Sequence, residues 1–292
     1  DKKGFYIIDA KEYQYAYRKN PKGSYVTFTG ESCSKTRKFE RGEAGVFESD
    51  LPIETRVLTD IYLEDDEPSE GHRLVFFDIE VSMEDNLPNV ETANNKITSI
   101  ALYDQITDEY HVLALDEYGS KDNYDKDNTY VKFFSDEYDL LSFFLDLWEG
   151  INPTIITGWN TNYFDVPYLY RRLTEVLGRG QANRLSSINK VKFSNYRKKY
   201  QIAGISSLDY LDLYKKFTYI EQPNYRLDTI GKLEVGMGKI EYDGTLDELF
   251  EQDLDKFVEY NLTDVKIVVE LEKKMKLIEL VRGICHIGHV QY

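Results

Sequence analysis

Two carboxylates interrupt an otherwise apolar segment. Asp78 and Glu80 lie within Leu74–Val81, a run of aromatic and β-branched residues that predicts a buried central strand. On a strand, residues two apart leave the same face, so these carboxylates would lie about 6–7 Å apart. Two like charges on a buried sheet are costly unless a cation neutralises them, and Mg²⁺ or Mn²⁺ binds carboxylate oxygens. The alternative is that one carboxylate faces solvent at a strand end.

Two further acids have neighbours that suggest chemistry. Asp165 follows a segment that begins at Asn160, and Pro167 favours a helix start, so Asp165 could also be a simple N-cap. Asp264 lies four residues after Tyr260 on a predicted helix, which places both on one face. A Tyr–Asp hydrogen bond at the helix surface is the alternative. Each pattern alone is common, but the ordered set is much less expected by chance.

The predicted elements around these acids are strands followed by alternating helices and a strand. Apolar runs predict strands at Leu74–Val81, Ile97–Tyr103, Tyr110–Leu115 and Thr154–Gly158. Helical periodicity predicts helices at Asp136–Trp148, Val166–Leu177 and Leu254–Leu280. We therefore expect an α/β fold, with a mixed sheet flanked by helices, in residues 72–292.

The first 71 residues have a different pattern. Short aromatic and β-branched runs at Phe5–Ile8 and Tyr25–Phe28 alternate with turn residues, which predicts a small, mostly β module. The acidic, turn-rich stretch Leu63–Gly71 predicts a linker. No apolar run approaches the ~18 residues of a spanning helix. Two cysteines and no signal-type N-terminus predict a cytosolic protein.

The charge distribution is uneven. The chain has 36 Lys and Arg against 52 Asp and Glu, a formal charge of −16, which by itself argues against nucleic-acid binding. The segment Val176–Leu208, however, has no acidic residue and seven basic ones: Arg179, Arg184, Lys190, Lys192, Arg197, Lys198 and Lys199. Within it, residues 190–203 alternate as in a two-stranded ribbon. A local basic surface in an acidic protein is more informative than the total.

The ordered acids resemble the three motifs of the DEDD 3′→5′ exonucleases, in the branch that carries a tyrosine. The surrounding residues extend this likeness to the exonuclease region of family B DNA polymerases, in particular the T-even phage type. The residues that carry it are Phe77-Asp78-Ile79-Glu80-Val81, Thr157-Gly158-Trp159-Asn160, Phe164-Asp165-Val166-Pro167-Tyr168, Leu208–Phe217 and Tyr242-Asp243-Gly244. Glu48–Pro52 and Arg56 are similar to the N-terminal domain of such enzymes.

The resemblance implies an RNase H-like fold and a metal-dependent nuclease. Four carboxylates, those of Asp78, Glu80, Asp165 and Asp264, would hold two divalent ions, Mg²⁺ or Mn²⁺. Tyr260 would orient the attacking water. The substrate would be single-stranded DNA or a frayed primer terminus, shortened from its 3′ end with release of 5′-mononucleotides. The enzyme would act in the cytoplasm of a bacterial host, with no membrane partner.

Contacts with DNA are expected at three places. Leu87, in the loop Glu84–Pro88 after the first motif, is a candidate wedge against the terminal base, although it could simply pack on the sheet. Phe164 and Tyr163 would line the same groove, or Phe164 could belong to the core, and Asn160 is a further candidate for contact with DNA. The hairpin at residues 190–203 would contact backbone phosphates, unless it is merely solvated. The basic candidates are Lys190, Lys192, Arg197, Lys198, Lys199 and Lys239.

The palm signatures of such polymerases are absent before the chain stops at Tyr292. We therefore expect a fragment, or half of a split polymerase, whose partner is the polymerase (palm) portion of the same or a separate chain. The alternatives are a module that binds DNA or a partner without catalysis, and a free-standing ribonuclease of the same superfamily. A zinc site at Cys285, His286 and His289 is disfavoured because only three ligands cluster. Gly231, Gly236 and Gly238 do not follow a strand, which disfavours a dinucleotide site.

Overall fold

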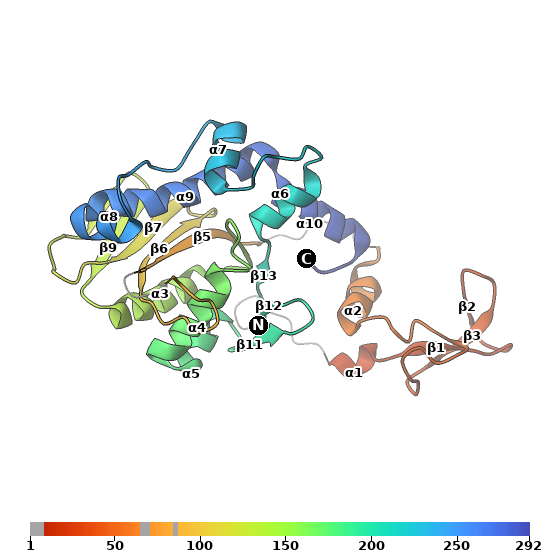
Figure 1. The fold of residues 1–292 in the computed structure, drawn as a ribbon. Helices are drawn as coiled ribbons and strands as arrows, with labels where there is room; N and C mark the ends of the chain where they lie inside the picture. Colours follow the sequence, from red (N-terminus) through yellow and green to blue (C-terminus); the bar gives the residue numbers. More distant parts are fainter. Residues whose placement is uncertain (1–8, 65–70, 84–86) are drawn as a thin grey trace. The chain divides into compact units, whose positions relative to one another are not determined.

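The computed structural model describes residues 9–64, 71–83 and 87–292 (Figure 1). The chain divides into two compact units, residues 1–69 with 281–292, and residues 70–280. The predicted strand Phe5–Ile8, most of the predicted linker and the loop residues Glu84–Asn86 lie outside the described residues. Within the described residues, no helix is both long enough and apolar enough to cross a membrane.

The N-terminal residues form a small antiparallel sheet with the order β2-β3-β1-β4. Its core includes the buried ring of Tyr15, which is contacted by the ammonium of Lys35 and the guanidinium of Arg56. Arg56 also pairs with Glu48 at 2.6 Å. The elements are α1 (Ala10–Tyr13), β1 (Ala16–Lys19), β2 (Tyr25–Val26), β3 (Ser32–Thr36), β4 (Val46–Phe47) and α2 (Ile53–Tyr62).

The larger unit contains a seven-stranded mixed sheet with the order β13-β10-β5-β6-β7-β9-β8. Strands β5, β6 and β7 form an antiparallel meander, whereas β10 runs parallel to β5. This mixed sheet confirms the predicted α/β class. The strands are β5 (Leu74–Val81), β6 (Ile97–Asp104), β7 (Glu109–Leu115), β8 (Tyr124–Lys126), β9 (Thr129–Phe134), β10 (Ile155–Thr157) and β13 (Ser206–Ser207).

Helices cover both faces of this sheet (Figure 1): α3 (Glu137–Ile151) and α4 (Asp165–Leu177) on one, and α9 (Leu254–Met275) on the other. Alternate β5 residues, such as Phe77 and Ile79, enter the core shared with α3 and α4. The Phe77 ring packs edge-on against Trp148 of α3, with centroids 6.1 Å apart. Because side chains alternate along a strand, Asp78 and Glu80 lie on the opposite face, toward α9.

The predicted helix Leu254–Leu280 is wrong as a single element. Helix α9 ends at Met275 because Lys276 adopts a left-handed conformation, with φ +53°, and a new helix, α10 (Leu277–Gly288), then begins. The buried carboxylate of Glu272 accepts the Ile278 N–H at 3.1 Å and so stabilises the break. The remaining elements are α5 (Arg179–Ala182), η1 (Asn183–Leu185), β11 (Val191–Ser194), β12 (Lys199–Ile202), α6 (Tyr210–Phe217), α7 (Leu227–Val235) and α8 (Leu246–Gln252).

Candidate metal centre

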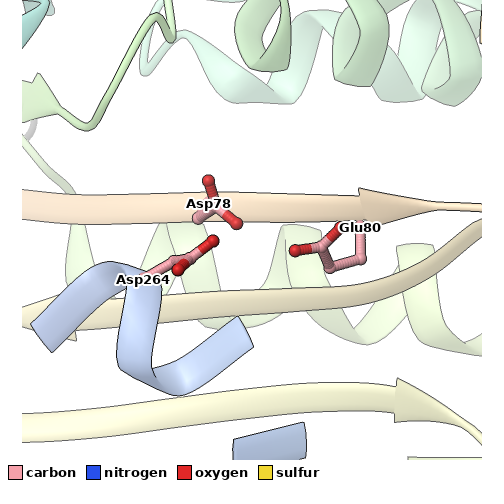
Figure 2. A group of neighbouring side chains, drawn as sticks. All are labelled: Asp78, Glu80 and Asp264. Atoms are coloured by element: carbon pink, nitrogen blue, oxygen red, sulfur yellow. The ribbon is translucent and has the colours of Figure 1, made fainter. Parts of the chain in front are cut away.

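Three carboxylates converge between β5 and α9. Asp78 and Glu80 extend from the strand and Asp264 from the helix, and their carboxylate groups gather in the space between the two elements (Figure 2). One oxygen from each lies within 4.8 Å of the others. Asp78 and Glu80 are partly buried, and Asp264 is only 2% exposed. The strand and the helix therefore bring together acids that are nearly two hundred positions apart in sequence.

Asp165 joins the site from the edge of β5. Strand β10 pairs with β5 only as far as Thr157, opposite Phe76, so the residues beyond Phe76 extend past the end of β10. The Ile79 N–H instead donates to Oδ1 of Asp165 at 3.1 Å. Asp165 is the first residue of α4 and is 3% exposed, so it is not the helix cap, which is Phe164.

Crowding of these acids has a clear electrostatic consequence. Burial, followed by repulsion from Asp264, raises the pKa of Glu80 to about 8. Burial also raises the pKa of Asp165 to about 7 and that of Asp264 above its usual range. For Asp78 the pKa is well above its usual range because burial adds to repulsion from Asp165. Without a cation, the site therefore retains protons at neutral pH.

One cationic side chain enters the cluster. Lys239, which follows α7, forms an ion pair with Asp264 and donates a hydrogen bond to the hydroxyl of Tyr260 at 3.0 Å. Burial lowers the pKa of Lys239, but the charge of Asp264 more than offsets this and raises it overall. Burial and Asp264 also raise the pKa of Tyr260, so its phenol stays neutral. Lys239 thus contacts Asp264, and its contact with DNA stays a prediction.

Sequence reasoning missed a buried carboxylate that supports the second motif. Asp209, the N-cap of α6, is 2% exposed and accepts three backbone N–H groups. Those of Asn160 and Leu211 lie 3.0 Å from its Oδ1, and that of Asn162 lies 2.9 Å from its Oδ2. Asp209 thereby ties α6 to the loop that leads into Asp165. The sequence offered one indication of its importance, since Asp209 lies in Leu208–Phe217, a segment that resembles the family.

A glycine permits the close approach of this loop to β5. A Cβ atom on Gly158 would lie 2.4 Å from the carbonyl oxygen of Phe77 and 2.5 Å from Cγ2 of Thr161. The Gly158 carbonyl also accepts the Tyr210 N–H at 2.9 Å. Asn160 then turns the chain with a positive φ of +68°. The predicted site residue Asn160 thus has a local structural function as well.

The donor set fits a hard divalent cation. The cluster offers carboxylate oxygens, which Mg²⁺ and Mn²⁺ prefer over nitrogen or sulfur. Oδ1 of Asp264 is buried and finds no hydrogen-bond partner among the residues that the structure describes. An unpaired buried carboxylate oxygen is costly, and coordination of a cation would satisfy it. Three of the four acids predicted to hold metal, those of Asp78, Glu80 and Asp264, therefore lie within reach of one cation.

The residues predicted to contact bases differ in how far they are buried. Leu87 is 82% exposed and so does not pack on the sheet. Phe164 is partly buried against the core and stacks on Tyr168, with ring centroids 5.5 Å apart. Its neighbour Tyr163 is 53% exposed.

The predicted ribbon forms an antiparallel hairpin of β11 and β12, with Phe193 opposite Tyr200. Tyr196 lies in the turn between the two strands and is 95% exposed. The basic residues are distributed along the hairpin: Lys190, Lys192, Arg197 and Lys198 are exposed and Lys199 is partly exposed. The hairpin thus presents cations and an aromatic ring to solvent on one element.

Comparisons with known proteins agree with this geometry. Residues 32–230 match the family model "DNA polymerase family B, exonuclease domain". The chain is similar to the DNA-directed DNA polymerases of Escherichia phage RB69, at 34% identity over 71% of this chain, and of Enterobacteria phage T4, at 33% over 75%. It is also similar to DNA polymerase 1 of Sulfurisphaera ohwakuensis, at 28% over 77%.

The matched lengths are a small part of these relatives. They cover 26% of the RB69 polymerase, 27% of the T4 polymerase and 23% of the Sulfurisphaera enzyme. The family match includes Asp78, Glu80 and Asp165 but ends before α9. Tyr260 and Asp264 are joined to that site by the geometry described above. The family model matches more than half of the residues, and the acidic centre lies between β5 and α9. The chain therefore belongs to the family of exonuclease domains of family B DNA polymerases.

Proposed function

We propose that this protein is a 3′→5′ exodeoxyribonuclease that proofreads DNA synthesis. Its substrate would be single-stranded DNA or the frayed 3′ end of a primer. Water would attack the terminal phosphorus, the bond to the 3′ oxygen of the preceding nucleotide would break, and a 5′-mononucleotide would leave. The convergence of three carboxylates, one with an unpaired buried oxygen, is the observation that carries this proposal.

Asp78, Glu80, Asp165 and Asp264 would hold two divalent ions, Mg²⁺ or Mn²⁺. When bound, such ions lower the pKa of water and stabilise charge on the phosphate and on the leaving oxygen. The carboxylates must be ionised to coordinate, so ion binding would release the protons that crowding retains. The chain's own contribution is to place and orient these acids.

Tyr260 would orient the attacking water. The ammonium of Lys239 has donors only, so the Tyr260 oxygen accepts from it and the phenolic proton stays available to another acceptor. Because its pKa is raised, the phenol would act as a hydrogen-bond donor and not as a base. The ring of Tyr242 packs edge-on against Tyr260, with centroids 5.4 Å apart, and limits its rotation.

Exposed aromatic, apolar and basic side chains of this chain suit binding of an unpaired strand. Tyr196 and the basic residues of the β11–β12 hairpin combine an aromatic surface with phosphate-binding charge, as single-strand sites do. Leu87 and Tyr163 are exposed and would contact the terminal bases. These contacts would favour DNA whose 3′ end is already separated from its template.

The polymerase portion of the same or a separate chain would be the functional partner. We infer this from the relatives, which are DNA polymerases of which this chain matches about a quarter. Proofreading would take place in the cytoplasm of a bacterial host. Removal of a mispaired 3′ nucleotide would then restore a primer for extension by that partner.

A labelled-end assay tests the proposed activity. Single-stranded DNA labelled at its 5′ end is incubated with Mg²⁺ and either wild-type protein or Asp264→Asn. We expect a ladder of products shortened from the 3′ end, absent with EDTA and in the variant. A matched RNA strand separates deoxyribonuclease from ribonuclease activity. No shortening by folded wild-type protein would contradict the proposal and favour a module that only binds DNA.

A further inference from the structure

Asn261 links α9 to two strands of the sheet. It follows Tyr260, is fully buried, and lies on the helix face that carries Asp264. Its Nδ2 is 2.8 Å from Oδ2 of Asp78 on β5, and its Oδ1 is 2.8 Å from Oγ of Ser99 on β6. Ser99 is also fully buried. The three side chains form a continuous hydrogen-bonded chain that ends at a candidate metal ligand.

The chemistry of these groups determines which group donates and which accepts in each of the two hydrogen bonds. Metal coordination requires an ionised Asp78 carboxylate, which only accepts hydrogen bonds, so the amide NH₂ of Asn261 faces Asp78 in the metal-binding state. The amide oxygen then faces Ser99, whose hydroxyl donates to it. A flipped amide would place its oxygen against the carboxylate oxygen and leave a buried repulsive contact. The Ser99 hydroxyl thus holds the amide in the one orientation that supports Asp78.

This bond restricts the carboxylate of Asp78 without covering it. One carboxylate oxygen has several acceptor sites, so Oδ2 can accept from Asn261 and still coordinate a cation. Hydrogen bonds to a ligating carboxylate fix its orientation and contribute strongly to metal affinity. We propose that Asn261 is a positioning residue that aims Asp78 at the divalent ions, with Ser99 as its anchor. The inference rests on the proposed function.

Direct measurement of Mn²⁺ binding tests this role separately from activity. Asn261→Leu keeps the volume of the side chain but removes both hydrogen bonds, and Ser99→Ala removes only the anchor. We expect Asn261→Leu to weaken Mn²⁺ binding by about 10–100-fold and Ser99→Ala to weaken it less. In degradation assays, kcat of Asn261→Leu should fall at low Mn²⁺ and recover at high Mn²⁺, with KM for DNA nearly unchanged.

Val269→Ala is the matched control because Val269 is buried on the same helix but is not part of the acidic cluster. It should lower Tm but leave Mn²⁺ affinity at the wild-type value. If Asn261→Leu does not fold, Ser99→Ala decides the question. If the folded variants bind Mn²⁺ with wild-type affinity while the wild-type protein degrades DNA, this inference is overturned but the proposed function is not. Wild-type protein that neither binds Mn²⁺ nor degrades DNA would overturn the proposed function as well.

Discussion

Lys239 forms an ion pair with Asp264, and so a loop residue places a positive charge inside the acidic centre. The Lys239 side chain is 33% exposed, whereas the Asp264 side chain is 3% exposed. This pair partly neutralises the crowded carboxylates in the metal-free protein. Lys239 and a bound cation therefore share one electrostatic role at Asp264.

Replacement of this lysine makes the protein depend more on metal. Lys239→Met should destabilise the metal-free protein by about 1–3 kcal/mol, since Asp264 loses its partner in a site that is only partly screened by water. Added Mn²⁺ should therefore raise Tm more in Lys239→Met than in wild type, as thermal melts with and without the ion will show. Lys273→Met, which removes an exposed pair with Glu270, is the control. An equal or smaller Mn²⁺ effect in Lys239→Met would contradict this role.

The pKa of Glu80 predicts how stability depends on pH. Folding raises this pKa from 4.5 to about 8, so the folded state binds the proton more tightly than the unfolded state. The resulting stabilisation is present below pH 4.5 and is lost as the pH rises through about 8. Glu80→Gln, which cannot ionise, should therefore have the higher Tm in EDTA at pH 8.

The same comparison at pH 5 supplies the first control, since Glu80 is then neutral in the folded protein and the difference in Tm should shrink. Glu279→Gln, an exposed substitution on α10, should show no such pH dependence. Mn²⁺ should raise the Tm of wild type more than that of Glu80→Gln. A wild-type protein more stable than the variant in EDTA at pH 8 would show that the acids are not crowded.

Asp209 should be important for both stability and activity. Asp209→Ala removes a helix cap and leaves the loop N–H groups of Asn160 and Asn162 without their acceptor, which predicts a loss of about 2–4 kcal/mol by urea unfolding. Nuclease activity should fall because Asp165 follows that loop. Asp253→Ala removes only an exposed cap, at the start of α9, and should cost about 1 kcal/mol. Equal losses in the two variants would argue against the loop contribution.

Gly158 and Gly150 provide a matched pair of alanine substitutions. Gly158→Ala should destabilise the protein by about 1–3 kcal/mol, because its Cβ would overlap the Phe77 carbonyl and Thr161. Gly150→Ala, in α3, meets nothing within 4 Å and should stabilise it by roughly 0.5–1 kcal/mol. Chemical denaturation measures both. A tolerated Gly158→Ala would mean that the second motif does not approach β5 so closely.

If the hairpin contacts DNA, variants that lack its lysines should show a weaker dependence of DNA affinity on salt concentration. Each phosphate contact adds about 0.7 to the slope of log K against log salt for single strands, so Lys192→Ala with Lys198→Ala should lower the slope by about 1.4. Fluorescence anisotropy in EDTA measures binding without degradation. Lys126→Ala, on β8, is the exposed control. An unchanged slope in the double variant would place the DNA elsewhere.

Local periodicity explains which parts of the fold could be predicted. The apolar run around Asp78 and Glu80 identified β5, and the alternation of strand side chains correctly placed both acids on one face. Helical spacing likewise placed Tyr260 and Asp264 together. Both inferences depend on neighbours within a few residues. The break at Lys276 escaped prediction because it depends on a bond between Glu272 and a backbone N–H beyond it.

Long-range contacts explain what could not be predicted. The bond from Asp165 to the Ile79 N–H joins residues 86 positions apart, and that from Asn261 to Asp78 spans 183. Lys239 lies in a loop without a helical or strand pattern, so its sequence neighbours do not indicate that it reaches Asp264. The role of Asn261 was accessible in part, since it lies three residues before Asp264 and so on the same helix face.

The short length of β10 also determines where Asp165 can lie. Because β10 stops opposite Phe76, the next part of β5 keeps a free edge, and Asp165 occupies that edge at Ile79. Two more paired residues on β10 would fill the same place with backbone and displace the carboxylate. A change in strand length alone, with every acid retained, would thus remove Asp165 from this centre.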